Sequence, residues 1–435
     1  MKKLVLTMIT IIAVSLITAC VQPVSEVDSF TLSGWTMKDY YDTEDEDALW
    51  EDGVELNVQY RDGTSESLDL DESVNDGIVT LTGDYEEDPL GLDTGDPGYY
   101  SVTISIDNVS LDFSYYVFDL ENARFVGDGE NDYDTITEAL DGVADGTTII
   151  VEEGTYSETL RMNDMTDLTI FGESEEGVIL DASDLDGQVF EMSGGTNFSL
   201  INMTVRDDFT GEDKSEWNFK IRGGTEGVFL KNITIEGPGK EYQLGENGSR
   251  ESITEDNYSW ANLIAGLDMH TVTDATLENV TVTGVSRNAM AFSTVTGLNL
   301  IDFNVYQTGT VQGSGSAAIA LYTATNSTIP TTVIEMTGSI SGAPIGINYS
   351  VPPFEGFEYG DVAIESTNVP LFLPYDEDDS DEAIQFANRV TGTPWQVHFS
   401  SGEGSGLAYY ATEAEANSFA DLFPDGSATV ENIAE

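Results

Sequence analysis

The stretch that decides the fold is Val228–Ile235, which reads VFLKNITI. Three apolar residues and Lys231 lead up to Asn232, and an alternating apolar–polar–apolar run, Ile-Thr-Ile, follows it. Period-two alternation is typical of a β-strand with one buried face, and a polar residue between two such runs marks a turn. The stretch therefore predicts a strand, a turn and a second strand.

The same pattern occurs four times, with turn residues Asn202, Asn232, Asn279 and Asp302. They are 30, 47 and 23 residues apart, and the longest interval contains an insertion at about Pro238–Trp260. Loops inserted between solenoid coils produce unequal spacing around a constant motif. We therefore expect the turn residues to stack into a ladder. An antiparallel sandwich is the alternative, but these strands are not joined by hairpin turns.

Each coil has a further strand upstream of that motif. These strands are expected over Gln188–Met192, Asn218–Arg222, Gly266–His270, Ala289–Ser293 and Ala318–Tyr322.

The repeats are preceded by a helix signal. Thr135 and Glu138 form a capping box, and apolar residues recur at helical spacing up to Val143. A buried strand (147–151), a turn (153–156) and the run LTIFG (168–172) follow. This order resembles the opening of right-handed parallel β-helix proteins of the pectin-lyase-like superfamily. The resemblance implies a β-helix over residues 123–375. In enzymes of this superfamily, the sheet that corresponds to the upstream strands forms the floor of the substrate cleft.

Two flanking regions complete the predicted organisation. Residues 376–435 are expected to cap the solenoid with helices over about 382–390 and 412–423, because the last coil would otherwise expose strand edges. In residues 30–119, Glu55–Tyr60 and the strand from Thr64 predict a hairpin across an Asp-Gly turn. The stretch Asp96–Ile106 is similar to the closing hairpin of bacterial immunoglobulin-like domains, which implies a β-sandwich spacer. The predicted fold class is all-β.

The N-terminus has the features of an export signal. Lys2 and Lys3 precede the apolar run Leu4–Ile17, which is too short for an ordinary membrane-spanning helix. The end of this signal, ITAC at residues 17–20, resembles the bacterial lipobox, which implies a signal peptide over residues 1–19, lipidation of Cys20 and a linker to residue 29. With Val21 next, we expect a lipid anchor at the outer membrane or cell surface. A plain secretory signal is the alternative.

The formal charge is −65, from 15 Lys and Arg against 80 Asp and Glu. This excludes a nucleic-acid binder that works by phosphate neutralisation. Self-repulsion on this scale is expected of a protein adapted to concentrated salt. A calcium-loaded surface is the alternative, with acidic residues such as those in 376–382 as ligands. A monomer is expected.

Side-chain direction on the upstream strands suggests a site. In Phe219–Arg222 and Leu267–His270 the apolar residues point inward, which leaves Lys220, Arg222, Asp268 and His270 outside. Aligning Gly-Gly-Thr at 194–196 with the same tripeptide at 223–225 places Glu191 beside Lys220. Glu191, Lys220 and Asp268 should then stack on successive coils at a spacing of about 4.8 Å. The next two coils are expected to present a smooth, mostly apolar outer surface of Ala289, Ala291, Ala318, Ala320 and Tyr322.

Cations and aromatic residues are concentrated around the same stretch. Seven of the 15 Lys and Arg residues lie between Arg206 and Arg250, and aromatic faces suit sugar rings. We expect an acidic polysaccharide as the ligand. The stacking candidates are Trp217, Tyr242, Tyr258 and Trp260. The alternative is that Lys220, Glu191 and Asp268 form a stabilising ion-pair ladder without a ligand.

Three functions stay open at this point: glycan binding, β-elimination on a uronic-acid polymer, and a non-catalytic structural or adhesive role. For β-elimination, Lys220 would be the base and Arg222 or His270 would hold the acid group. Glu191 and Asp268 would then bind calcium. With two histidines and one cysteine, zinc sites and Ser-His-Asp or Cys-His systems are not expected.

Overall fold

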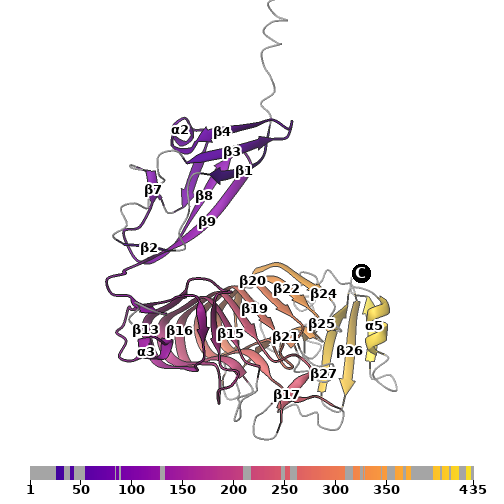
Figure 1. Cartoon of the computed structure of the whole chain (residues 1–435). Helices are drawn as coiled ribbons and strands as arrows, with labels where there is room; N and C mark the ends of the chain where they lie inside the picture. Colours follow the sequence, from indigo (N-terminus) through magenta and orange to yellow (C-terminus); the bar gives the residue numbers. More distant parts are fainter. Residues whose placement is uncertain are drawn as a thin grey trace, which may run out of the picture. The chain divides into compact units, whose positions relative to one another are not determined.

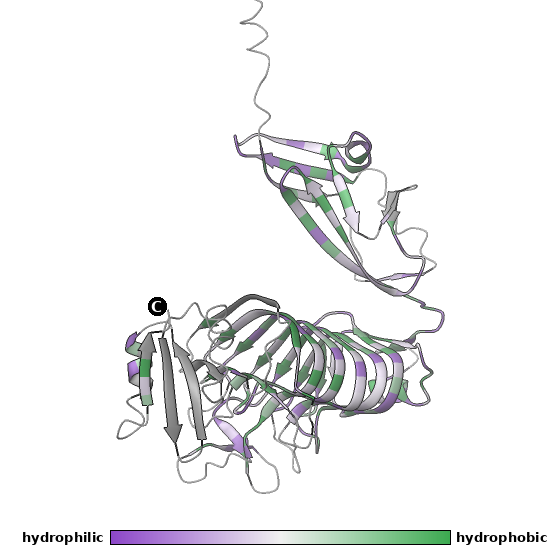
Figure 2. Ribbon diagram, turned by 180° about the vertical axis from the view of Figure 1, so that it is seen from behind, coloured by the Kyte–Doolittle hydropathy of each residue, from purple (hydrophilic) through white to green (hydrophobic). Residues whose placement is uncertain are grey.

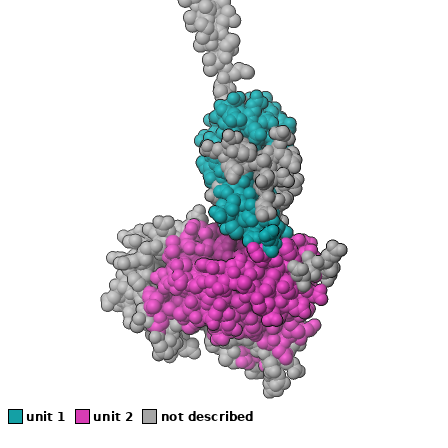
Figure 3. Space-filling view, turned by 90° about the vertical axis from the view of Figure 1, so that its left-hand side faces the viewer, with its two compact units in different colours: residues 1–121 teal, residues 122–435 magenta. Residues whose placement is uncertain are grey.

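The computed structural model describes residues 26–33, 40–43, 54–83, 85–87, 90–127, 133–208, 217–245, 250–254, 262–308, 317–323, 327, 329–343, 345–349, 358–365, 369–373, 395–401, 404–410, 413–420 and 428–432. The chain divides into two compact units, residues 1–121 and 122–435 (Figure 3). Each unit has its own hydrophobic core.

The second unit is a parallel β-helix, as the sequence predicts (Figure 1). From β10 to β25, the paired strands of its long sheet all run parallel. These strands are β10 (Arg124–Val126), β11 (Thr148–Val151), β12 (Gly154–Tyr156), β13 (Leu160–Gly172), β14 (Val178–Asp181), β15 (Phe190–Arg206), β16 (Trp217–Glu236), β19 (Ala265–Thr283), β20 (Met290–Tyr306), β21 (Ala317–Tyr322), β22 (Val333–Ser341), β23 (Ile345–Tyr349), β24 (Glu358–Glu365) and β25 (Val369–Leu373).

The long strands turn corners while they stay paired to the neighbouring coils. Asn202, Asn232, Asn279 and Asp302 all have positive φ, between 51° and 54°, a left-handed conformation that Asn and Asp tolerate better than most residues. The Asn232 amide donates to Asn202 Oδ1 and the Asn279 amide donates to Asn232 Oδ1, each at 2.8 Å. The predicted ladder of turn residues is therefore confirmed for the three asparagines.

The core of the β-helix lies inside the coils. Along the strands, inward residues such as Phe219 and Ile221 are fully buried, while Lys220 between them is partly exposed. This alternation appears along the coils in Figure 2. Phe190 and Phe219 stack between successive coils with their ring centroids 4.1 Å apart. Burying one such side chain contributes about 1.5–3 kcal/mol, so the repeat is held by a continuous apolar stack.

Helix α3 (Ile136–Leu140) precedes β11, and Thr135 caps it as predicted, accepting a hydrogen bond from the Glu138 amide at 3.1 Å. The helix ends before Val143 because Gly142 takes a left-handed conformation, with φ of 60°. The turn predicted at 153–156 is wrong, since residues 154–156 form β12 and pair with β14.

The C-terminal end contains more strand than the sequence predicts. Strands β26 (Trp395–Ser401), β27 (Gly404–Tyr410) and β28 (Ala428–Asn432) pair antiparallel, and β27 also pairs antiparallel with β25. Reversing strand direction ends the parallel repeat and covers its edge. Helix α5 (Glu413–Ala420) lies within the helix predicted at 412–423, whereas the helix predicted at 382–390 falls outside the described residues.

The first unit consists of small sheets that are mostly antiparallel. One sheet has the order β1-β3-β4 and another the order β2-β9-β8-β5, in which β2 runs parallel to β9. The predicted hairpin from Glu55 is formed by β3 and β4, and the second hairpin by β8 and β9. The elements are β1 (Val27–Ser33), β2 (Tyr40–Asp42), β3 (Glu55–Tyr60), β4 (Ser65–Asp69), α2 (Leu70–Asn75), β5 (Thr80–Gly83), β6 (Tyr85–Glu87), β7 (Leu90–Leu92), β8 (Gly98–Ile106) and β9 (Val109–Phe118).

Both larger sheets of the first unit contribute to one core. Leu56 of β3, Val102 and Ile104 of β8, and Tyr115 of β9 are fully buried in the same cluster. The first strand begins at Val27, three residues before the predicted start of the domain. The immunoglobulin-like identity of this unit stays a prediction.

The predicted signal peptide at residues 1–19 and the predicted lipidation site at Cys20 lie outside the described residues. Within the part of the chain that the structure describes, no helix has the length and apolar character needed to cross a membrane.

Candidate functional site

The strand register brings the predicted charged residues together. Glu191 of β15 pairs with Lys220 of β16, and Lys220 pairs with Asp268 of β19. Arg222 and His270 are paired in the next outward position of the same two strands. The predicted stacking order is therefore confirmed. Arg161 of β13 extends the row, because it pairs with Glu191 on the preceding coil. We call Arg161, Glu191, Lys220 and Asp268 the charge column.

The charged side chains of the column are linked in two groups. Glu191 is bound by two arginines, with Arg222 Nη2 at 2.5 Å from Oε1 and Arg161 Nη1 at 3.0 Å from Oε2. Lys220 Nζ lies 3.7 Å from Asp268 Oδ2. The predicted ion-pair ladder exists in part, but Glu191 is held by the arginines while Lys220 pairs with Asp268.

Asp268 is the buried end of the column. Burial raises the pKa of its carboxyl above the ordinary value of 3.8, and the positive charges of Lys220, His270 and Arg287 partly oppose that shift. Desolvation disfavours the ionised carboxylate, and nearby cations favour it. Asp268 is thus a carboxyl whose charge depends on the surrounding cations.

His270 is exposed at the edge of this site. Its Nδ1 lies 3.0 Å from the Thr271 hydroxyl, and Thr271 occupies the corner that follows, with φ of 58°. The imidazole lies in register with Arg222, so it can reach a ligand that the guanidinium group contacts.

The aromatic residues are less available than the sequence suggests. Trp217 is only 8% exposed, and the Arg287 guanidinium lies 5.4 Å from its ring centroid. Its predicted role as an open stacking surface does not fit this burial. Tyr242 lies in a hairpin of the insertion, with the Arg250 guanidinium 4.8 Å from its ring centroid. The hairpin consists of β17 (Tyr242–Leu244) and β18 (Arg250–Ser252).

The remaining two aromatic candidates, Tyr258 and Trp260, fall outside the described residues.

The apolar surface expected beside the charges is covered. Ala291 and Ala320 follow Asp268 in register, as predicted, but both are buried. They belong to a third hydrophobic cluster that also contains Trp217, Ala265, Ala317, Ile345 and Ala416. Ala289 and Ala318, also predicted to face outward, lie in the main core instead. Strict alternation fails there because Ala289 and Met290, like Ala318 and Ile319, are consecutive core residues.

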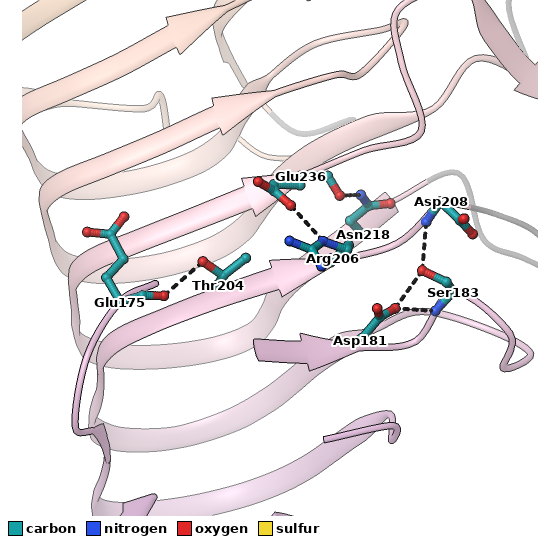
Figure 4. Close-up of polar contacts among 8 residues, drawn as sticks. All are labelled: Glu175, Asp181, Ser183, Thr204, Arg206, Asp208, Asn218 and Glu236. Carbon is teal, nitrogen blue, oxygen red and sulfur yellow. Dashed lines mark hydrogen bonds and ion pairs between the residues drawn. The ribbon is translucent and has the colours of Figure 1, made fainter. Parts of the chain in front are cut away.

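The cationic stretch between Arg206 and Arg250 is not one surface. Arg206 Nε pairs with Glu236 at 2.7 Å at the ends of β15 and β16 (Figure 4). Lys231 pairs with Glu278 at 2.7 Å on the middle segments of β16 and β19. The coil turns corners between these positions and the segment that carries Lys220. The cations between Arg206 and Arg250, which are close in sequence, therefore do not form one surface patch. Lys214 falls outside the described residues.

The structure offers little to the calcium hypothesis. In the described part of the chain, no group of three or more His, Cys, Asp or Glu side chains could hold a metal ion. Glu191 and Asp268, the predicted ligands, lie on the coils either side of Lys220, and each is paired with a cation.

Comparison with known proteins adds little. No protein-family model matches the chain, and no curated protein matches it. Among solved structures, the chain is similar to the crystal structure of the pectin methylesterase from Aspergillus niger in deglycosylated form, at 15% identity over 60% of this chain and 88% of that chain, with a TM-score of 0.19. A similarity this weak carries no argument about activity, so the fold assignment rests on the strand register.

Proposed function

We propose that the β-helix unit binds an acidic polysaccharide on the outer face that carries the charge column. The observation behind the proposal is a local excess of positive charge. Arg161, Lys220 and Arg222 gather around Glu191 and Asp268, on a chain in which acidic residues outnumber basic ones by 80 to 15. An anionic ligand would therefore bind more favourably here than on the acidic surface around this site.

The exposed parts of the site suit a polymer. Arg161 and Arg222 have side chains that are 41% and 50% exposed. Their strands belong to coils that repeat at about 4.8 Å, so a chain lying along the solenoid axis would meet charged groups at successive steps. An extended glycan with acid groups on its sugars matches this arrangement.

The same geometry gives less support to β-elimination. A lysine that acts as a base must first lose its proton, and loss of that proton would break the pair between Lys220 and Asp268 at 3.7 Å. It would also leave the buried Asp268 without that cation. Binding without chemistry is therefore the function that we propose.

A titration of the soluble chain with pectate, alginate and chondroitin sulfate, and with dextran as a neutral control, tests the proposal. We expect heat of binding with at least one acidic polymer and none with dextran. Failure of every acidic polymer to bind would favour the structural or adhesive role. Growth of ultraviolet absorbance from unsaturated sugar ends would instead favour a lyase.

We also propose that the protein is anchored at the cell surface through lipid on Cys20, with the first unit acting as an immunoglobulin-like spacer. The support is the apolar run followed by ITAC at residues 17–20. Replacing Cys20 with Ser should block lipidation and shift the protein out of the membrane fraction or leave the precursor unprocessed. A Cys20→Ser variant with unchanged mass and membrane association would contradict the anchor.

A further inference from the structure

The Glu191 carboxylate holds two arginines from different coils. Arg161 comes from the coil before it and Arg222 from the coil after it. One carboxylate oxygen contacts each guanidinium group, at 3.0 Å for Arg161 and 2.5 Å for Arg222. The Arg161 guanidinium also donates to Gln188 Oε1 at 3.1 Å. Both arginines are therefore fixed near one point before any ligand binds.

The chain leaves room for this arrangement. A Cβ atom at Gly187 would lie 2.9 Å from Arg161 Nη2, closer than ordinary contacts allow, and Gly187 has φ of 88°. A side chain there would push the guanidinium group away. Gly187 therefore lies directly beside the Arg161 guanidinium group, and its positive φ also favours glycine at this position.

Each guanidinium group keeps donors for a ligand. A guanidinium carries five N–H donors, and the contacts above use one terminal nitrogen of Arg161 and one of Arg222. The two side chains are about half exposed. Arginine binds carboxylates through two parallel hydrogen bonds when its planar fork is held in place.

We infer that Arg161 and Arg222 form a clamp that contacts two acid groups of the same polymer, and that Glu191 is a positioning residue rather than a ligand contact. The inference rests on the proposed function and narrows it to polymers with acid groups on neighbouring sugars. A single sugar with one acid group can bind only one of the two arginines. A polymer gains from both, because the second contact forms within the complex at high effective concentration.

The matched control is the Arg206–Glu236 pair. It also joins residues 30 positions apart on successive coils, and the Arg206 side chain is 40% exposed. Figure 4 shows this pair, with the side-chain amide of Asn218 donating to the Glu236 carbonyl oxygen. Replacing Arg206 changes net charge by the same amount as replacing Arg161.

The experiment measures binding of oligogalacturonate and of free galacturonate to the full chain and to R161Q, R161K, E191Q and R206Q. We expect R161Q to weaken oligomer binding about tenfold, the equivalent of one charge-assisted contact, and to change monomer binding much less. R161K should recover part of that loss, since lysine restores the charge without the fork. R206Q should bind the oligomer as the wild-type chain does.

The E191Q variant tests whether Glu191 positions the two arginines or only repels an anionic ligand. Removing a negative charge from the site would raise affinity for an anion if Glu191 only competed with the ligand. We expect affinity for the oligomer to fall instead, because the arginines lose their shared partner. Tighter oligomer binding by E191Q, or equal loss in R161Q and R206Q, would overturn the clamp while leaving the proposed function intact. No binding of any acidic polymer to the wild-type chain would overturn both.

Discussion

Two lysine–carboxylate pairs join the same strands, β16 and β19, and they differ in almost every other respect. Lys231 and Glu278 lie 2.7 Å apart, and the Lys231 side chain is 9% exposed. Lys220 and Asp268 lie 3.7 Å apart, and here the carboxylate is the more buried partner. In register, Ile201 and Ile301 flank the first pair, whereas Glu191 and Ala291 flank the second.

The few cations of this very acidic chain thus occur in two kinds of surroundings. Lys231 pairs with Glu278 between Ile201 and Ile301, and we call these two residues the balanced pair because they carry one positive and one negative charge. Around Asp268, by contrast, Lys220, His270 and Arg287 all act on one carboxyl, and the two arginines share Glu191. We interpret the balanced pair as structural and the cation-rich group as a ligand site.

The largest expected effect is on stability at the balanced pair. Glu278→Gln removes the carboxylate that the buried Lys231 ammonium contacts, and because breaking a fully buried pair costs about 3–5 kcal/mol, we expect a somewhat smaller loss here, where Glu278 is partly exposed. Urea denaturation measures the loss, and urea avoids the screening that a guanidinium salt would add. A stability change no larger than that of Glu236→Gln would contradict the structural role.

A smaller effect, dependent on pH, is expected at the cation-rich group. Because the pKa of Asp268 is raised in the folded chain, its contribution to stability is present below the ordinary value of 3.8 and is lost as pH rises through the higher folded value. Asp268→Asn removes this dependence. The melting temperature of the wild-type chain minus that of the variant should therefore fall from about pH 4 to pH 7. Calorimetry at fixed salt would contradict this reasoning if the difference grew with pH.

Salt should act in opposite directions on the fold and on the site. The Debye length falls from about 10 Å at 0.1 M to about 3 Å at 1 M, so repulsion among the surface carboxylates weakens. With a formal charge of −65, we expect KCl to raise the melting temperature by a few degrees, equivalent to about 1 kcal/mol. Over the same range, affinity for an acidic glycan should decrease. If the melting temperature and the glycan affinity both rose or both fell with salt, repulsion across the fold and attraction at the site could not be the separate effects that we propose.

Much of the fold is readable from the sequence because the corners repeat. The turn residues at 202, 232 and 279 fix the phase of each coil, and the Gly-Gly-Thr corners place Glu191 beside Lys220. The Gly-Gly-Thr alignment does not predict the position of Arg161, because its coil turns at Asp164, with φ of 52°, where the next coil has a glycine. Its one sequence signal is the interval of 30 residues to Glu191.

Features set by distant contacts are not readable in this way. Trp217 is covered by Arg287, and Ala320 shares a cluster with Ala416 of α5, nearly a hundred residues further along. The cations from Arg206 to Arg250 are neighbours in sequence, but the corners of the coil direct them to different segments. Alternation predicts which side of a strand a residue occupies, and it cannot predict what lies over that side.

The most direct test compares two double variants that each remove two positive charges. Lys220→Ala with Arg222→Ala removes cations of the proposed site, whereas Lys240→Ala with Arg250→Ala removes exposed cations at the insertion. Affinity electrophoresis through gels containing pectate, or whichever acidic polymer the wild-type chain binds, measures both. We expect the first variant to lose at least about tenfold in affinity and the second to match the wild-type chain, and circular dichroism checks that both variants are folded. Equal retention of the two variants would contradict the assignment of the site to this face.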